Sequence, residues 1–202
     1  METEHNLTMS QLIFKFPFKT KYYEKDYYVS SNNFSVYRLI ESWPNWPDKW
    51  VNIFGPKGSG KTHLSNILKK KISSSQIFDA KDINNDKITS FEKLNCLIID
   101  DYENNIDEKT LYSILNQSKQ LNKFVVINSI IPIKDINFEL KDLRSRAKSF
   151  VNFGIELPTD DLLRVIISKS FSDKQIEITP RISEYIIKNI ERSYEKVFKF
   201  IK

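Results

Sequence analysis

The chain has 202 residues, 40% of them hydrophobic and 28% charged, and its net charge of +5 is spread along its length. This composition is ordinary for one medium-sized soluble domain with a real core, and the mild basic excess permits contact with nucleic acid without demanding it. Cys96 is the single cysteine and no apolar run approaches the length of a membrane span, which excludes an intrachain disulfide and a membrane-spanning segment and predicts a cytoplasmic protein.

The N-terminal part of the chain divides into short stretches of different character. Residues 1–10 are polar and aperiodic, and we expect them to be disordered. A short apolar segment runs from Gln11 to Phe16, directly before Pro17. It is either an edge strand or a linear peptide that docks in a pocket of another protein, and its spacing favours neither. Residues 21–34 are rich in aromatic side chains, which would either wall a nucleotide base or pack in the core.

The stretch 50–63 has the pattern of a strand, a glycine turn and a helix. Within it, Gly55-x-x-x-x-Gly60-Lys61-Thr62 is typical of a phosphate-binding loop, in which backbone N–H groups converge on an anion. Lys61 would then reach the β- and γ-phosphates and Thr62 would hold Mg²⁺. The alternative is a turn that binds nothing, but three of the four glycines of the chain lie here. The residues expected to contact a nucleotide are Gly55, Lys57, Gly58, Ser59, Gly60, Lys61, Thr62 and His63.

Strand and helix patterns alternate along the rest of the chain. Strands are predicted at 51–54, 76–80, 94–99, 124–127 and 150–157. Helices are predicted at 35–42, 64–72, 107–119 and 160–171, with two more after Thr179 and from Glu191 onward. This order predicts an α/β domain over residues 21–157, with a parallel five-stranded sheet flanked by helices, and a small helical lid over 158–202. The helix after Thr179 is expected to bury a stripe formed by Ile182, Tyr185, Ile186 and Ile190.

Acidic and polar residues stand at the ends of two apolar strands. The carboxyl ends of parallel strands open on the ligand crevice, so Asp100 is a candidate to hold Mg²⁺ and Asp101 to orient an attacking water as general base. Asn128 and Ser129 end the next strand and would hydrogen-bond the γ-phosphate or that water. The alternatives are a strand-end cap for the acidic pair and a turn for the other pair.

Arginines in three positions are candidates for neutralising charge on a transferring phosphate. Arg144 and Arg146 lie just before the last predicted strand, and Arg192 lies in the helical tail. An arginine can act in this way from its own chain or from a neighbouring one. Physical reasoning does not choose among them, and each is equally compatible with a surface charge.

Taken together, these motifs resemble the AAA+ module of the bacterial replication initiator family, DnaA. The matching stretches occur in order along the chain at 27–32, 55–64, 97–101, 126–129, 143–146 and 190–193. The resemblance covers roughly residues 21–202 and implies an AAA+ P-loop NTPase that binds ADP or ATP with Mg²⁺.

The resemblance implies a nucleotide-binding role for residues in several of these stretches. Val29 and Asn32 belong to the segment that leads into the nucleotide pocket of the family. Lys61, Thr62 and Asp100 match its nucleotide and magnesium positions.

The resemblance also implies catalytic roles. Asp101 matches the second acidic residue of the family, and Ser129, with Asn128 beside it, matches sensor 1. Arg146 matches the arginine finger, which would act in trans on ATP held by the initiator. Arg192 matches the sensor 2 arginine of the lid.

The ends of the chain differ from the initiator. We expect neither its C-terminal helix-turn-helix domain after residue 202 nor its N-terminal partner-binding domain. The tail 1–20 instead resembles the clamp-binding tail of Hda, the truncated regulatory homologue of DnaA. This resemblance favours docking on the DNA polymerase III sliding clamp (beta subunit) through a peptide at 11–16, with contacts from Gln11, Leu12, Phe14 and Phe16.

Some positions depart from the pattern of the family. Ile130-Ile131 stands where the family has Asp-Arg, so a charged contact is lost. Ala147 replaces an aromatic residue after the finger, and Asp142 replaces a second arginine. The loss of the charged contact is expected to affect a partner interface or the hydrolysis step. The change at Ala147 is expected to affect the packing of the finger.

The sequence therefore predicts a regulator of replication initiation that binds adenine nucleotide, docks on the sliding clamp and stimulates hydrolysis of initiator-bound ATP. Its expected partners are DnaA and the clamp, with DNA reached through the clamp, no membrane, and a homo-oligomer as a further option. The alternative is a helicase-loader or transposon-type AAA+ ATPase that acts on single-stranded DNA. A small kinase and a nucleotide-binding scaffold without catalysis also remain open.

Overall fold

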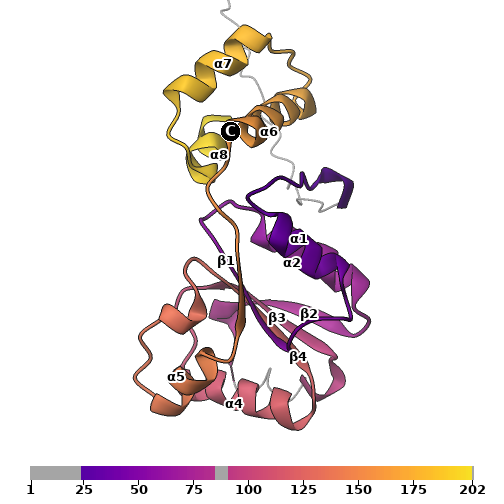
Figure 1. Ribbon diagram of the computed structural model, residues 1–202, viewed down its shortest axis with the longest axis vertical. Helices are drawn as coiled ribbons and strands as arrows, with labels where there is room; N and C mark the ends of the chain where they lie inside the picture. The colour runs from indigo at the N-terminus through magenta and orange to yellow at the C-terminus, as the bar shows by residue number, and fades with distance from the viewer. Residues whose placement is uncertain (1–23, 85–90, 202) are drawn as a thin grey trace, which may run out of the picture.

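The computed structural model describes residues 24–84 and 91–201. Within these residues the centre is a five-stranded sheet in the order β2-β3-β4-β1-β5, with parallel pairings between neighbours (Figure 1). The strands are β1 (Trp50–Phe54), β2 (Ser75–Asp79), β3 (Cys96–Tyr102), β4 (Phe124–Ser129) and β5 (Val151–Gly154). The predicted α/β class and the parallel five-stranded sheet are confirmed. The strand expected over 150–157 ends at Gly154, where the chain leaves the sheet toward the lid.

Helices cover both faces of the sheet: α1 (Phe34–Glu41) and α2 (Lys61–Lys71) on one, and α4 (Glu108–Gln120) and α5 (Lys141–Ala147) on the other. Successive side chains of a strand point to opposite faces. Ile98 and Val126 accordingly join the core under α1 and α2, whereas Ile99 and Ile127 join the core under α4 and α5. Burial on both faces explains why β3 and β4 have continuous apolar runs.

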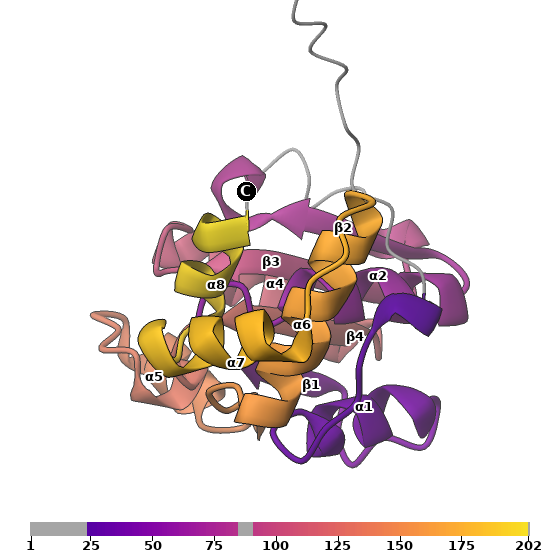
Figure 2. The same cartoon turned by 90° about the horizontal axis from the view of Figure 1, so that it is seen from above.

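The lid lies over the carboxyl ends of the strands (Figure 2). Its helices are α6 (Asp160–Asp173), α7 (Pro180–Asn189) and α8 (Tyr194–Ile201). Thr159 caps α6 and Thr179 caps α7, each by accepting a hydrogen bond from a backbone N–H of the first turn. The predicted start of a helix at Thr179 and Pro180 is therefore confirmed. Leu163 and Ile167 of α6 form a separate apolar cluster with residues of α7 and α8.

The apolar stripe predicted on α7 is wrong in part. Ile186 is buried and Ile190 is half-buried, but Ile182 is 49% exposed and Tyr185 is 70% exposed. Ile187 joins the lid cluster in their place. The reason is that the face of α7 turned toward the lid carries Ser183, Ile186, Ile187 and Ile190, at the spacing of one helix face, and this face leaves Ile182 and Tyr185 outside.

Short 3₁₀ turns connect the larger elements: η1 (Glu24–Asp26), η2 (Ala80–Asp82), η3 (Phe91–Lys93) and η4 (Ile133–Asp135). The segment after η1 is fixed to the linker between sheet and lid. The Asn32 side-chain amide donates to the carbonyl of Leu157, and the Asn32 carbonyl accepts a hydrogen bond from the Glu156 N–H at 3.1 Å. The peptide predicted at 11–16 lies outside the described residues. Among those that are described, no helix has the length and apolarity needed to cross a membrane.

Candidate nucleotide-binding site

The loop between β1 and α2 has the backbone shape that its sequence predicts. The Gly55 N–H donates to the Ser129 carbonyl at 3.2 Å, which holds the start of the loop against β4. Gly58 and Gly60 have φ angles of 79° and 92°, in the left-handed region that favours glycine. Gly60 directly precedes α2, so the unpaired N–H groups of the first helical turn face the loop. The backbone of this loop is therefore able to bind an anion.

Lys61 is buried beneath the loop. Its Nζ donates to the carbonyl oxygens of Gly55 at 2.6 Å and Pro56 at 2.9 Å. Burial has the largest effect and lowers the pKa of Lys61, although the carboxylates of Asp100 and Asp101 act in the opposite direction. A phosphate group beside Nζ would favour the charged amine. An anion bound at the loop would therefore stabilise the charged form of Lys61.

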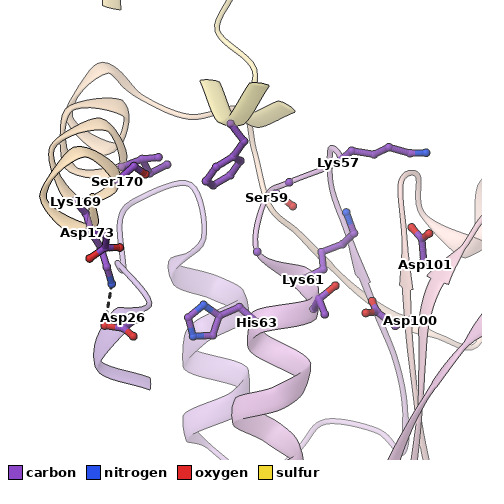
Figure 3. A pocket seen from close by; sticks show the side chains of 15 residues that line it. Asp26, Lys57, Ser59, Lys61, His63, Asp100, Asp101, Lys169, Ser170 and Asp173 are labelled. Carbon is purple, nitrogen blue, oxygen red and sulfur yellow. Dashed lines mark ion pairs between the residues drawn. The ribbon is translucent and has the colours of Figure 1, made fainter. Parts of the chain in front are cut away.

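A cavity of about 640 Å³ extends from the loop to the lid (Figure 3). Its loop end is lined by Lys57, Gly58, Ser59, Gly60, Lys61, Thr62 and His63, together with Asp100 and Asp101 of β3. Every predicted loop residue except Gly55 therefore lines the cavity. The loop end is suited to phosphates, and the rest of the cavity, toward the lid, leaves room for a nucleoside.

The far end of the cavity is formed by residues that the sequence analysis missed. Lys169 and Asp173 come from α6, Phe198 comes from α8, and Asp26 comes from η1. Lys169 Nζ lies 2.8 Å from Asp26 Oδ1, across the end of the cavity (Figure 3). No local pattern marks these residues, because only the folding of the lid over η1 brings them together.

The end of β3 places its acidic residues in different environments. The pairing with β4 shifts between Ile99 and Tyr102, and Asp101 has a φ of 56°. A left-handed angle costs a residue with a Cβ about 1 kcal/mol or more, and such strain is often found at functional sites. Asp100 is half-buried near Lys61, whereas Asp101 is exposed (Figure 3). Asp100 is thus suited to hold a cation beside the loop, and Asp101 to contact water.

The donors at the loop end fit magnesium better than a metal that needs many protein ligands. Among the residues described, no group of three or more His, Cys, Asp or Glu side chains could hold a metal ion. Thr62 and Asp100 contribute one hydroxyl and one carboxylate to the cavity. Mg²⁺ usually keeps several waters and binds through one or two carboxylates plus substrate phosphates. These residues therefore fit Mg²⁺ that arrives with a nucleotide.

The polar residue of β4 that contacts Asp100 is Asn128, whereas the resemblance assigned the sensor position to Ser129. The Asn128 Nδ2 donates to Asp100 Oδ1 at 2.8 Å and to Ser65 Oγ at 2.7 Å. The Ser129 Oγ donates to the Ile131 carbonyl at 2.6 Å and so faces away from Asp100. Because neighbouring strand residues point to opposite faces, β4 turns Asn128 toward α2 and Ser129 toward the other side. Of the two residues, Asn128 is therefore better placed for the sensor role that the resemblance implies.

Arg192, expected to contact the nucleotide from the lid, does not line the cavity. Its guanidinium nitrogen lies 3.1 Å from Asp160 Oδ2 at the start of α6, and its side chain is 67% exposed. This ion pair holds the arginine outside the cavity. The lid approaches the loop through α8 instead, since a Cβ added to Gly58 would lie 3.0 Å from the Cβ of Tyr194.

Val29 and Asn32, also expected at the nucleotide, lie outside the cavity. Val29 lines a separate hollow beside α1, and Asn32 is buried against the linker to the lid. Tyr27 of the same segment lies closer to the loop: its ring is edge-on to that of His63, with centroids 5.4 Å apart, and a Cβ on Gly60 would meet it at 3.0 Å. Burial raises the pKa of Tyr27.

Arg146 of α5 lies near the amino-terminal end of β1. The guanidinium carbon of Arg146 is 5.8 Å from the ring centre of Trp50, the first residue of β1, whereas the cavity opens where β1 ends. Arg144 donates to the carbonyl of Phe138. Figure 1 shows α5 and the lid at opposite ends of the molecule. An arginine placed there is suited to a nucleotide held by another molecule.

Comparisons with known proteins agree with this geometry. A family model described as RNA helicase matches residues 51–142. The chromosomal replication initiator protein DnaA of Symbiobacterium thermophilum is 24% identical over 202 residues, covering 88% of this chain and 44% of the relative. Domain III of Thermotoga maritima DnaA has a TM-score of 0.73 at 19% identity, over 92% of this chain and 88% of that one. The chain is thus similar in sequence to DnaA proteins, and it has the fold of an AAA+ P-loop NTPase.

The matches extend over most of this chain but over a smaller share of several of its relatives. A replication initiator DnaA bound to AMPPCP and single-stranded DNA matches with a TM-score of 0.72 at 19% identity, over 91% of this chain and 64% of that one. At this identity the structural match shows the fold. The chain spans less than half the length of the curated relatives it matches.

Proposed function

We propose that this chain is a DnaA-like regulator of replication initiation. It binds ADP or ATP with Mg²⁺ in the cavity beneath the lid and docks on the DNA polymerase III sliding clamp through residues 11–16. It then presents Arg146 to ATP that the initiator DnaA holds. This role is carried out in the cytoplasm, with DNA reached through the clamp, and it is compatible with a homo-oligomer.

The observation that carries the proposal is the separation of Arg146 from the chain's own cavity. Arg146 lies beside Trp50 at the start of β1, and the phosphate loop begins after its end. No arginine among the described residues lines the cavity. An arginine finger is typically worth about 10³–10⁵ in rate. The chain's own hydrolysis is therefore expected to be weak, and its arginine is available to a partner.

Each part of the cavity has a role in holding the nucleotide. The loop amides and Lys61 bind the phosphates. Thr62 and Asp100 would hold the Mg²⁺ that arrives with the nucleotide. Asn128 fixes the Asp100 carboxylate through its hydrogen bond. The AMPPCP bound to the structurally similar DnaA supports an adenine nucleotide as the ligand.

The proposal is tested by measuring ATP hydrolysis by the initiator, with clamp loaded on DNA, in the presence and absence of this protein. Stimulation should depend on the clamp and should be lost in Arg146→Ala and in Gln11→Ala. Arg181→Ala, an exposed arginine on α7, is the matched control and should retain it. Nucleotide binding should be unchanged in all three variants. Stimulation that survives Arg146→Ala would overturn the finger, and stimulation without clamp would overturn the docking step.

A second candidate is an AAA+ ATPase of the helicase-loader or transposon type. The family model described as RNA helicase and the DnaA solved with single-stranded DNA favour it. Tight, clamp-independent binding to single-stranded DNA would support this candidate, provided that affinity falls steeply with salt as phosphate contacts require.

A further inference from the structure

Arg146 is held between two aromatic side chains, which we call the arginine cage. Its guanidinium carbon lies 5.8 Å from the ring centre of Trp50 and 5.0 Å from the ring centre of Tyr112. Trp50 belongs to β1 and Tyr112 to α4, so the cage brings together separate elements around the C-terminal end of α5. Cations over aromatic faces at such distances are attracted by the negative face of the ring.

The cage is rigid on its tryptophan side. Trp50 is buried, its Nε1 donates to Ser118 Oγ at 2.8 Å, and its ring stacks on Phe150 with centroids 5.6 Å apart. Tyr112 is half-buried on α4 and provides the second ring of the cage. A hydrogen bond with Arg146 also lowers the pKa of Tyr112, after a larger effect from a hydrogen bond with Asn116.

One donor of the caged arginine is left unsatisfied. The Arg146 Nε is buried and has no hydrogen-bond partner among the described residues. Buried polar groups in proteins are nearly always hydrogen-bonded, and an unpaired one is costly. The rings and the Tyr112 hydrogen bond therefore hold the cation, and the buried Nε–H would gain a partner only if the side chain left the cage for an anion. Arg144 on the same helix differs, since its Nε donates to the Phe138 carbonyl.

In the cage, the Arg146 side chain packs against its own domain. To act on a nucleotide held by a partner, it would have to leave the cage and extend outward. We propose that Trp50 and Tyr112 are positioning residues that hold Arg146 against the domain until the triphosphate of a partner molecule draws it out. This inference rests on the proposed function, in which Arg146 acts on ATP held by another chain. The cage then sets how readily the finger is presented, while Arg146 itself supplies the charge.

The cage is tested first without any partner, by NMR of the arginine side-chain Nε–H groups in the full chain. The signal of Arg146 is assigned by its loss in Arg146→Lys. It should be displaced by the neighbouring rings and should exchange slowly with water. Tyr112→Leu should move it to the ordinary arginine position, and Tyr112→Phe, which keeps the ring, should leave most of the displacement. Tyr185→Leu makes the same change at an exposed site on α7 and should have no effect.

The positioning role is tested by titrating the same variants into the initiator ATPase assay with clamp on DNA. Losing a cation–π contact should lower the concentration of Tyr112→Leu needed for half-maximal stimulation by about two- to five-fold, with the maximal rate unchanged. Tyr112→Phe keeps the ring but loses the hydroxyl that bonds to Arg146, so its half-maximal concentration should lie between those of wild type and Tyr112→Leu.

Each result bears on a different part of the inference. An Arg146 signal at the ordinary position in wild type, or one that Tyr112→Leu does not move, would overturn the cage. A displaced signal with an unchanged half-maximal concentration in Tyr112→Leu would overturn the positioning role. A displaced signal with no stimulation by wild type would overturn the proposed function, and the positioning role with it, while the cage itself would stand.

Discussion

The Asn128 side-chain amide donates a hydrogen bond of 2.8 Å to the Asp100 carboxylate across the ends of β4 and β3. The same nitrogen donates to Ser65 Oγ of α2, so the amide is anchored on both sides. The remaining Asn128 Oδ1 is buried without a hydrogen-bond partner among the described residues. If Asp100 holds Mg²⁺ as proposed, Asn128 would orient that carboxylate, and its free oxygen could accept a hydrogen bond from a water beside it.

Asn128→Ala should weaken binding of the magnesium nucleotide. A residue that orients a metal ligand typically contributes about 10- to 100-fold to metal affinity or activity, so we expect a loss of at least about 10-fold for MgADP and a smaller loss for ADP with EDTA. Calorimetric titration measures both. Ser129→Ala changes the neighbouring residue, which does not contact Asp100. This variant should bind MgADP and ADP with EDTA as wild type does. Equal losses in the two variants would contradict the assignment of the sensor position to Asn128.

Gly58→Ala should loosen the lid. The new Cβ would lie 3.0 Å from the Cβ of Tyr194, and the left-handed φ of 79° is strained for alanine. We expect the free energy of unfolding to fall by about 1–2 kcal/mol and amide exchange in α8 to become faster. Gly60→Ala has similar backbone strain but meets Tyr27 instead, so it should destabilise the protein without exposing α8. Unchanged amide exchange in α8 of Gly58→Ala would show that the packing of the lid does not depend on a glycine at this position.

The ion pair between Asp26 and Lys169 should slow nucleotide release. It joins η1 to α6 across the end of the cavity, but the side chains are 33% and 42% exposed, so it is worth at most about 1 kcal/mol. Lys169→Glu should therefore speed release of a fluorescent ADP analogue by up to about five-fold, with a smaller effect at high salt. The double reversal Asp26→Lys/Lys169→Glu should restore slow release. A double variant as fast as Lys169→Glu would rule out the pair as the cause.

Lys61 should make stability depend on alkaline pH. Burial lowers its pKa below 10.5 in the folded protein, so the unfolded chain holds this proton more tightly. The contribution of Lys61 to stability, relative to Lys61→Met, should be constant near neutral pH and increase as pH rises from the lowered pKa toward 10.5. Denaturant unfolding of both proteins without nucleotide, from about pH 7 to about pH 10.5, measures the difference. A difference that falls over this range would mean that the pKa is raised.

The sequence was most informative where chemistry is local. The strand, glycine turn and helix around Lys61 form one continuous segment, and the acidic pair follows a strand whose burial is visible in its apolar run. The choice between Asn128 and Ser129 depended on which face of β4 each residue occupies, and a shift of one residue reverses that choice. The far end of the cavity was not predictable, because Asp26 and Lys169 are distant in the chain and meet only through the packing of the lid. Arg192 matched a family position, but its pairing with Asp160 is a property of the folded lid.

The cavity lies at the carboxyl ends of the parallel strands and Arg146 lies toward their amino ends, so the molecule has two different functional surfaces at opposite ends. A contact that joins the arginine of one molecule to the cavity of the next uses two different surfaces, and such contacts build either closed rings or open filaments. An open row built in this way has polarity: the molecule at one end has a cavity that no arginine reaches, and the molecule at the other end has an arginine that serves no cavity. If Arg146 acts as proposed, the order of molecules in such a row would decide which bound nucleotides are hydrolysed, and adding one molecule at the correct end would change the outcome for its neighbour.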